Sequence, residues 1–223
     1  MADEQNLNEN QMDLLKKLAA IGSDLWGGMP SAAYEKEEVP DKQKGTAPAQ
    51  APAKKKENGI HQLWKTADET VDWTDALAHD APTDGLTGRR LWSFYHRMAE
   101  KVLSGDLEAY TEVLKTSNPL GELTAFAEGI SMRAPDAERV EAQFNCRAEF
   151  MEDDAKQYLC AMGVRIARDL LACLPVSEVG VTAVQDGKTV MEATYRRENM
   201  LHRNFSFLDP VKLTEECGGT FGL

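Results

Sequence analysis

The strongest constraint on the fold is a long amphipathic segment followed at once by two alternating stretches. Residues 153–174 carry apolar side chains at helical spacing along their whole length, and Pro175 ends the pattern. The apolar face is as wide as a helix that covers a sheet requires, and it consists of Tyr158, Leu159, Met162, Ile166, Leu170, Cys173 and Leu174. The polar residues are expected on the outer face, with an i,i+4 spacing between Arg165 and Asp169; they are Lys156, Arg165, Arg168 and Asp169.

Two strands are predicted directly after this helix. Residues 179–184 and 189–195 flank Asp186-Gly187, a strong signal for a short hairpin turn. Upstream, residues 130–146 also alternate and predict a first hairpin with one buried face. Two hairpins joined by one long helix predict an α+β fold. In this fold, N-terminal helices precede a four-stranded, mainly antiparallel ββαββ sheet that the long helix covers on one face.

Further helical patterns lie before and after these strands. Apolar residues at helical spacing predict helices over 60–71 and 89–103, and Gly105 ends the second. Asp106 is expected to cap a third helix that forms a hairpin with the second. Asp209, which precedes a proline, is expected to cap a last short helix.

The first part of the chain is expected to be organised differently. Residues 7–26 combine an apolar stripe with an opposite polar face, which predicts a short amphipathic helix that is marginal on its own. Residues 35–58 are rich in Lys, Glu, Ala and Pro and cannot bury enough apolar area to fold, so they are predicted to be a disordered linker. The predicted regions are a tethered helix within 1–34, the linker, and a single α+β domain over 59–223. The residues predicted to bind a partner are Leu14, Leu18, Ile21, Leu25 and Trp26.

The charge of the chain narrows the range of its partners. A formal net charge of −12 argues against a nucleic acid and against an anionic membrane surface, because both are bound through Lys and Arg. No run approaches the roughly 18 apolar residues of a membrane span. The N-terminus also lacks the basic region and apolar core of a secretory signal. We therefore expect a cytoplasmic protein whose partner is another protein or a second copy, bound through residues 7–26.

Motifs of the common catalytic classes are missing from the sequence. It has no G-x-S-x-G, no G-x-x-x-x-G-K-[ST], no G-x-G-x-x-G and no H-E-x-x-H. Its cysteines form no C-x-x-C pair and are expected to be small, buried, reduced side chains rather than zinc ligands; they are Cys146, Cys160, Cys173 and Cys217. We predict no cofactor and assign no catalytic or metal-binding residue.

Two groups of residues could carry metal chemistry if the fold brought their members together. Carboxylates and an imidazole near one loop could bind a divalent cation, or they could simply cap helices in a solvated loop; they are Asp72, Asp75, His79, Asp80 and Asp84. Acidic residues and a lysine around the second hairpin suggest the carboxylate pairs of some nucleases, although no E-x-K follows. These are Glu178, Asp186, Lys188 and Glu192.

A third group interleaves basic and aromatic residues, a pattern that suits phosphate contact with base stacking. Its members are Arg89, Arg90, Trp92, Tyr95, His96 and Arg97. The apolar residues of the same helix are needed for the core, which leaves the arginines on an outer face. An outer basic face on an acidic protein favours an intramolecular or protein contact over a nucleic acid.

The C-terminal part of the chain resembles a module found in bacterial proteins of unknown function. The run "YLCAMGVRIARDLLACLP", the strands after it, and "FLDPVKL" are similar to that α+β module over about residues 158–213. The shared pattern is a helix ending in D-L-x-x-x-L-P, two strands, and a late D-P before a short helix. The resemblance implies no activity and no site residue.

Taken together, these patterns predict a non-catalytic interaction or adaptor protein that docks a partner or itself through its tethered helix. The alternative is a metal-dependent hydrolase or nuclease whose site is assembled only in three dimensions. A metal-dependent thermal shift that is abolished by changing His79 or Asp80 would favour the alternative.

Overall fold

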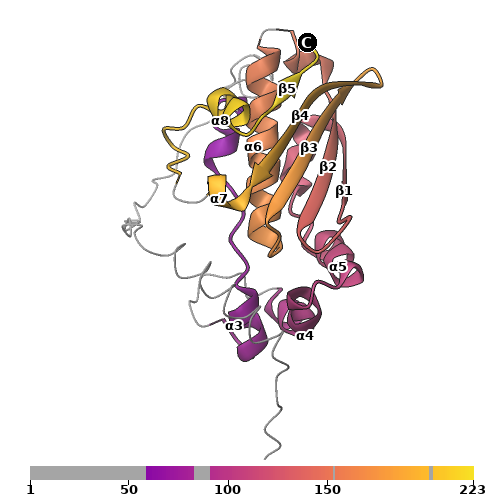
Figure 1. Cartoon of the computed structure of the whole chain (residues 1–223), viewed down its shortest axis with the longest axis vertical. Helices are drawn as coiled ribbons and strands as arrows, with labels where there is room; N and C mark the ends of the chain where they lie inside the picture. The colour runs from indigo at the N-terminus through magenta and orange to yellow at the C-terminus, as the bar shows by residue number, and fades with distance from the viewer. Residues whose placement is uncertain (1–58, 83–90, 153, 201–202) are drawn as a thin grey trace, which may run out of the picture.

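The described part of the chain has an α+β fold. In this computed structural model, Figure 1 shows one sheet with a long helix across one face and shorter helices around it. The predicted helix at 7–26 and the predicted linker at 35–58 lie outside the described residues. The structure describes four stretches of the chain, which are residues 59–82, 91–152, 154–200 and 203–223.

The sheet has five strands, where the sequence predicted four. In chain order and in sheet order they are β1 (Ala127–Arg133), β2 (Arg139–Cys146), β3 (Glu178–Gln185), β4 (Lys188–Arg196) and β5 (Thr220–Phe221). All neighbours pair antiparallel except β2 and β3, which are parallel and joined through α6 (Ala155–Cys173). The two predicted hairpins are β1–β2 and β3–β4. The additional strand β5 has only two residues, too few to show an alternating pattern.

The turn between β3 and β4 follows the chemistry predicted for it. Asp186 and Gly187 have φ angles of 50° and 74°, both in the left-handed region. A two-residue hairpin turn of type I′ requires this conformation at both positions, and Asp and Gly tolerate it better than most residues. This turn therefore sets the pairing of Gln185 with Lys188, and an irregularity between Ala183 and Val184 shifts the register along the rest of β3 and β4.

Helix α6 packs across one face of the sheet, as predicted. The Asp154 side chain caps its start by accepting from the Gln157 N–H. Phe144 of β2 meets Tyr158 of α6 edge to face, with ring centroids 6.2 Å apart. At Gly163 the helix carries no side chain, which allows β4 to approach closely. The apolar face of α6 and the inner face of the sheet thus form the core of the domain.

Three helices lie together at the lower end of Figure 1, namely α3 (Trp73–Ala78), α4 (Trp92–Leu103) and α5 (Leu107–Ser117). The Asp106 side chain caps α5 by accepting from two backbone N–H groups, as predicted. Gly105 provides the positive φ of 78° between α4 and α5. Trp73 and Tyr95 join α3 to α4 through an edge-to-face contact of 5.4 Å.

Short elements complete the domain. The predicted cap at Asp209 is confirmed, because its side chain accepts from the N–H groups of the first turn of α8. The remaining short helices are η1 (Leu63–Lys65), η2 (Gly121–Ala125), η3 (Ala148–Phe150), α7 (Arg197–Met200) and α8 (Pro210–Glu216).

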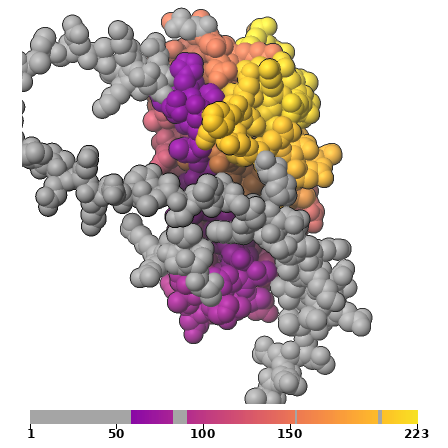
Figure 2. All heavy atoms as spheres, turned by 90° about the vertical axis from the view of Figure 1, so that its left-hand side faces the viewer, coloured from indigo at the N-terminus to yellow at the C-terminus, as the bar shows by residue number. Residues whose placement is uncertain are grey.

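The prediction of a helix over 60–71 is wrong. Gly59 and Ile60 are helical and Leu63–Lys65 form the single turn η1, after which the segment runs extended along α6. Residues 59–72 are called the strap. Backbone hydrogen bonds within the strap are confined to its first residues, and beyond them its polar groups bond to distant parts of the chain: the Val71 N–H donates to the Ala172 carbonyl over 2.9 Å. Trp64 Nε1 donates to the Leu208 carbonyl over 3.0 Å. Figure 2 shows the start of the strap beside the C-terminal segment.

The strap also buries residues on the face of α6 that points away from the sheet. The sequence predicted that Arg165 and Asp169 face outward, but they are buried, with exposures of 5% and 0%. The strap covers them: the Asp68 N–H donates to Asp169 Oδ1 over 2.9 Å, and Arg165 donates to the Thr66 hydroxyl. The guanidinium of Arg168 donates to the Thr66 carbonyl as well. The expected spacing of the Arg165–Asp169 pair is confirmed, while its outward orientation is not.

Candidate functional site

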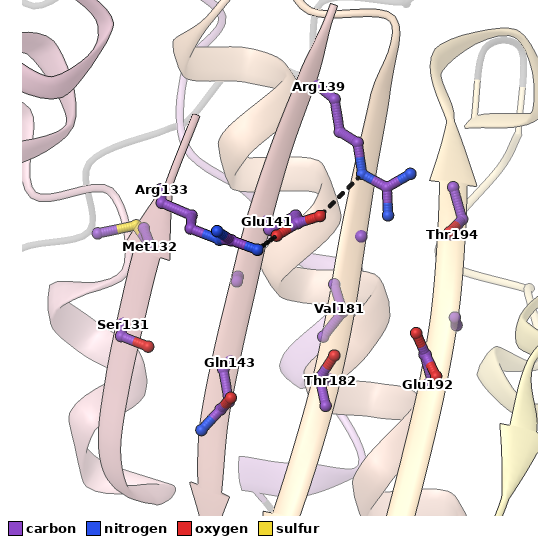
Figure 3. A pocket seen from close by; sticks show the side chains of 13 residues that line it. Ser131, Met132, Arg133, Arg139, Glu141, Gln143, Val181, Thr182, Glu192 and Thr194 are labelled. Carbon is purple, nitrogen blue, oxygen red and sulfur yellow. Dashed lines mark ion pairs between the residues drawn. The ribbon is translucent and has the colours of Figure 1, made fainter. Parts of the chain in front are cut away.

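The face of the sheet opposite α6 is lined by polar side chains. Along β2, Val140 and Phe144 are buried on the α6 side, and Glu141 and Gln143 point to the other side. Strands β3 and β4 also place polar side chains on that other side, although Gly180 of β3 and Val190 of β4 interrupt the alternation of burial. This surface, shown in Figure 3 and called the open face, is a hollow of about 420 Å³. The polar residues that line it are Ser131, Arg133, Arg139, Glu141, Gln143, Thr182, Glu192 and Thr194.

A row of ion pairs crosses the open face from β1 to β4. Arg133 Nη2 lies 2.5 Å from a Glu141 carboxylate oxygen, and Arg139 Nε lies 3.3 Å from the other. Arg139 Nη1 donates to Glu178 over 2.9 Å, and Arg196 Nε lies 3.7 Å from the same carboxylate. This row is called the Arg–Glu ladder. Its three arginines and two glutamates leave one net positive charge.

Strand register produces this ladder. Arg133 is paired with Glu141 across β1 and β2, and Glu178 is paired with both Arg139 and Arg196 on its two neighbours. Directly opposed residues on one face of a sheet bring their side chains within about 5 Å of each other. Alternating signs of charge are therefore placed side by side across four strands.

A glycine in β3 makes room for the central arginine of the ladder. A methyl group on Gly180 of β3 would lie 2.9 Å from Arg139 Nη2, so the missing side chain leaves room for the guanidinium to lie over the strand. Arg139 Nε is buried and makes no hydrogen bond. Its side chain is only 34% exposed, whereas Arg133 and Arg196 at the two ends are 76% and 62% exposed. The ladder thus has a fixed centre and accessible ends.

Beside the ladder, the open face offers uncharged hydrogen-bonding groups. Ser131, Gln143, Thr182 and Thr194 come from four adjacent strands and point to the same side (Figure 3). Hydroxyl and amide groups both donate and accept hydrogen bonds. The combined surface can therefore hold a protein segment through hydrogen bonds along its centre and through charge at its edge.

The acidic group near His79 does not form a metal site in the described structure. Asp72 caps α3, and His79 Nδ1 lies 2.7 Å from Asp75 Oδ1. Asp80 lies 3.4 Å from a different imidazole, that of His96. Within the described residues, no group of three or more His, Cys, Asp and Glu side chains could hold a metal ion. Asp84 lies outside those residues.

The acidic group at the second hairpin is also spread out. Glu178 is paired in register with Arg196, while Glu192 is paired with Thr182, four residues further along β3. Four residues of strand span about 13 Å. Glu178 belongs to the Arg–Glu ladder, and Asp186 and Lys188 sit at the turn.

The aromatic residues of the basic group belong to the core. Trp92 and Tyr95 are buried, and His96 Nδ1 lies 2.7 Å from the Ala76 carbonyl oxygen. Arg97 stacks over Phe94, with 5.4 Å from its guanidinium carbon to the ring centroid. These rings are not available for stacking on bases. Arg89 and Arg90 lie outside the described residues.

The cysteines match their predicted role as buried thiols. Cys146, Cys160 and Cys173 are buried and free, and Cys217 is partly buried. Burial raises the pKa of the Cys146, Cys160 and Cys173 thiols to about 11. A thiol with such a pKa stays protonated near neutral pH and is a poor nucleophile.

The predicted partner-binding residues Leu14, Leu18, Ile21, Leu25 and Trp26 lie outside the described structure. The Arg–Glu ladder was not anticipated. One signal for it was present in the sequence, since polar residues occupy every second position from Arg139 to Asn145. The pairing of these residues with β1, β3 and β4 depends on strand register, which the sequence alone did not supply.

No protein-family model matches the chain, and no curated protein or solved structure matches it either. No helix among the described residues is long and apolar enough to cross a membrane.

Proposed function

We propose that this protein is a non-catalytic interaction or adaptor protein of the cytoplasm. It would carry two docking elements, namely the tethered helix expected at 7–26 and the open face of the sheet. The observation that supports this proposal is the open face itself, which is polar, hollowed and four strands wide. An adaptor needs two separate surfaces, and the predicted linker at 35–58 would let the two elements engage different partners.

The charges of the open face favour a protein as its partner. The exposed ends of the ladder, Arg133 and Arg196, suit carboxylates on a facing surface. Glu141, Glu178 and Glu192 share the face and would repel a phosphate backbone. Polar groups in the centre add hydrogen bonds of the kind found in protein interfaces.

A matched pair of substitutions tests the open face. Thr182→Trp fills the hollow, and Thr111→Trp places the same ring on the exposed surface of α5. Each full-length variant would be tagged, and captured proteins would be quantified against the unchanged chain. We expect Thr182→Trp to lose a partner that Thr111→Trp retains, with equal melting temperatures. A partner set unaffected by Thr182→Trp would contradict docking at this face.

Removal of residues 1–34 tests the second element. We expect this truncation to keep the melting temperature of the domain and to lose a partner, or self-association, that Thr182→Trp keeps. Loss of stability on truncation would instead place the helix in the core. A thermal shift on adding Mg²⁺, Mn²⁺ or Zn²⁺ that disappears in His79→Ala would favour the metal-dependent hydrolase or nuclease.

A further inference from the structure

Strand β1 forms the long edge of the sheet. It pairs only with β2, and Figure 1 shows it as the outermost strand, with no described element beyond it. Among the described residues, no backbone hydrogen bond joins residues 129–133 to any segment other than β2. An edge strand of this kind presents a row of unpaired N–H and C=O groups to a further strand. The opposite edge, β5, has only two residues.

The usual protections of an edge strand are weak here. Proteins blunt an edge with proline, with charged side chains, with bulges or with a covering loop. Strand β1 has no proline, its charged residues Glu128 and Arg133 lie near its two ends, and its one register irregularity lies between Ala127 and Gly129. From Gly129 to Arg133 the register with β2 continues without a break. These five residues form a regularly paired strand whose residues are exposed or only partly buried.

The side chains of this stretch complement themselves. An antiparallel pair must place residues of the same sheet face opposite each other. If Ser131 lies on a two-fold axis, it faces Ser131 of a second copy on the open face, and Ile130 faces Met132 of that copy on the α6 side. Both apolar side chains are only partly buried in one chain. A second copy would cover their exposed flanks.

The ends of the stretch fit in the same register. Arg133 would face Gly129 of the second copy, where the missing side chain leaves room for a long one. The register centred on Ile130 would instead place Met132 against Glu128, and is less favourable. The apolar pairs and the room at Gly129 thus favour this register, and a second copy of the same edge supplies both.

We propose that the protein forms a two-fold symmetric dimer by antiparallel pairing of β1 with β1 of a second copy. The two sheets then become one continuous sheet, and the two open faces become one surface. Arg133 lies at the junction, so the two Arg–Glu ladders meet there. Because the same edge is used by both copies, the pairing closes on itself and leaves no β1 edge for a third copy.

The symmetry of Ser131 gives a sharp test with full-length protein. Ser131→Lys places two ammonium groups opposite each other at the axis, and Ser131→Glu places two carboxylates there. Like charges directly opposite weaken a strand pair, and opposite charges strengthen it, by up to about fivefold in each case. We therefore expect each variant alone to dimerise more weakly in sedimentation equilibrium. An equimolar mixture should recover a tight heterodimer. Thr194→Lys, on the same face at β4, is the matched control and should dimerise as the unchanged chain does.

A cross-link tests the register directly. Ser131→Cys in a Cys217→Ser background should give a disulfide-linked dimer on mild oxidation, and Thr194→Cys in that background should not. A chain that stays monomeric at all concentrations would overturn the proposal. A dimer whose affinity is unchanged by Ser131→Lys, and unchanged in the mixture of Ser131→Lys with Ser131→Glu, would also overturn it. Loss of the dimer in Leu18→Asp, with no effect of Ser131→Lys, would assign self-association to the predicted helix instead.

Discussion

Arg165 and Asp169 form an ion pair inside the protein. Arg165 Nε donates to Asp169 Oδ2 over 2.6 Å, one turn apart on α6, and both side chains are buried. Asp68 and Glu122 each place a carboxylate oxygen within 3.7 Å of the same guanidinium. The pair lies under the strap, so the stability of the pair and the position of the strap depend on each other.

Breaking the pair from the arginine side should be costly. Arg165→Met leaves the Asp169 carboxylate buried without its partner, and removal of one member of a buried pair typically costs about 3–5 kcal/mol. We expect a loss of this size in urea unfolding at pH 7. The matched control is Arg203→Met, which removes an exposed 3.0 Å pair with Glu216 and should cost less than about 1 kcal/mol. Equal losses in the two variants would contradict the structural role of the buried pair.

The stability of the domain should depend on pH through Asp169. Burial raises the pKa of Asp169 to about 6, against the opposing effect of the hydrogen bond from Arg165. An unfolded aspartate has a pKa of about 4. Between these values the folded state binds a proton that the unfolded state has released, so stability falls as the pH rises. The contribution is therefore complete below pH 4 and is lost as the pH passes through 6.

Asp169→Asn isolates this effect, because the other carboxylates cancel between the two proteins. We expect the stability advantage of the unchanged chain over Asp169→Asn to shrink between pH 4.5 and pH 7. Urea midpoints at several pH values would measure it. An advantage that grows with pH would show that pairing with Arg165 outweighs burial and lowers the pKa of Asp169.

The sequence predicted those elements whose signals are local. The caps at Asp106 and Asp209 and the turn at Asp186-Gly187 act within a few residues, and each is confirmed by hydrogen bonds or by backbone angles. The strap was mistaken for a helix because its backbone partners lie on α6, about a hundred residues away in the chain. Its few apolar residues have a spacing that fits a helix equally well.

The residues of the open face could likewise be predicted from the sequence only in part. Alternation along β2 marks Arg139 and Glu141 as neighbours on one face, and this pattern is visible in the sequence. The partners that complete the ladder, Arg133 and Arg196, come from β1 and β4. Their positions follow from the order and register of the strands, which are tertiary properties.

Truncation should locate the true start of the domain. A chain that begins at Gly59 keeps the strap and should unfold at the same urea concentration as the full chain. A chain that begins at Trp73 loses four buried side chains, each worth about 1.5–3 kcal/mol, namely Ile60, Leu63, Trp64 and Val71. It also exposes the Arg165–Asp169 pair, so we expect it to be unfolded or barely stable. If the chain that begins at Gly59 were less stable than the full chain, part of residues 1–58 would belong to the core.

Gly163 should resist the substitution that helix propensity favours. Alanine stabilises a helix interior by about 1 kcal/mol over glycine, yet a methyl group here would lie 2.6 Å from the Tyr195 hydroxyl oxygen and 3.1 Å from Met191 Cε. Tyr195 is fully buried and its hydroxyl lies 2.9 Å from Thr214 Oγ1. Overpacking of a core costs about 1–3 kcal/mol, so we expect Gly163→Ala to be destabilising overall.

Tyr195→Phe provides the companion variant, because it removes the atom that the new methyl group would strike. In the Tyr195→Phe background, Gly163→Ala should cost at least about 1 kcal/mol less than it does in the unchanged chain, which is a coupling typical of residues in contact. Urea unfolding of the two single variants and the double variant measures that coupling. Additive effects would mean that α6 and β4 can move apart at this point, and that the contact between Gly163 and Tyr195 does not set their separation.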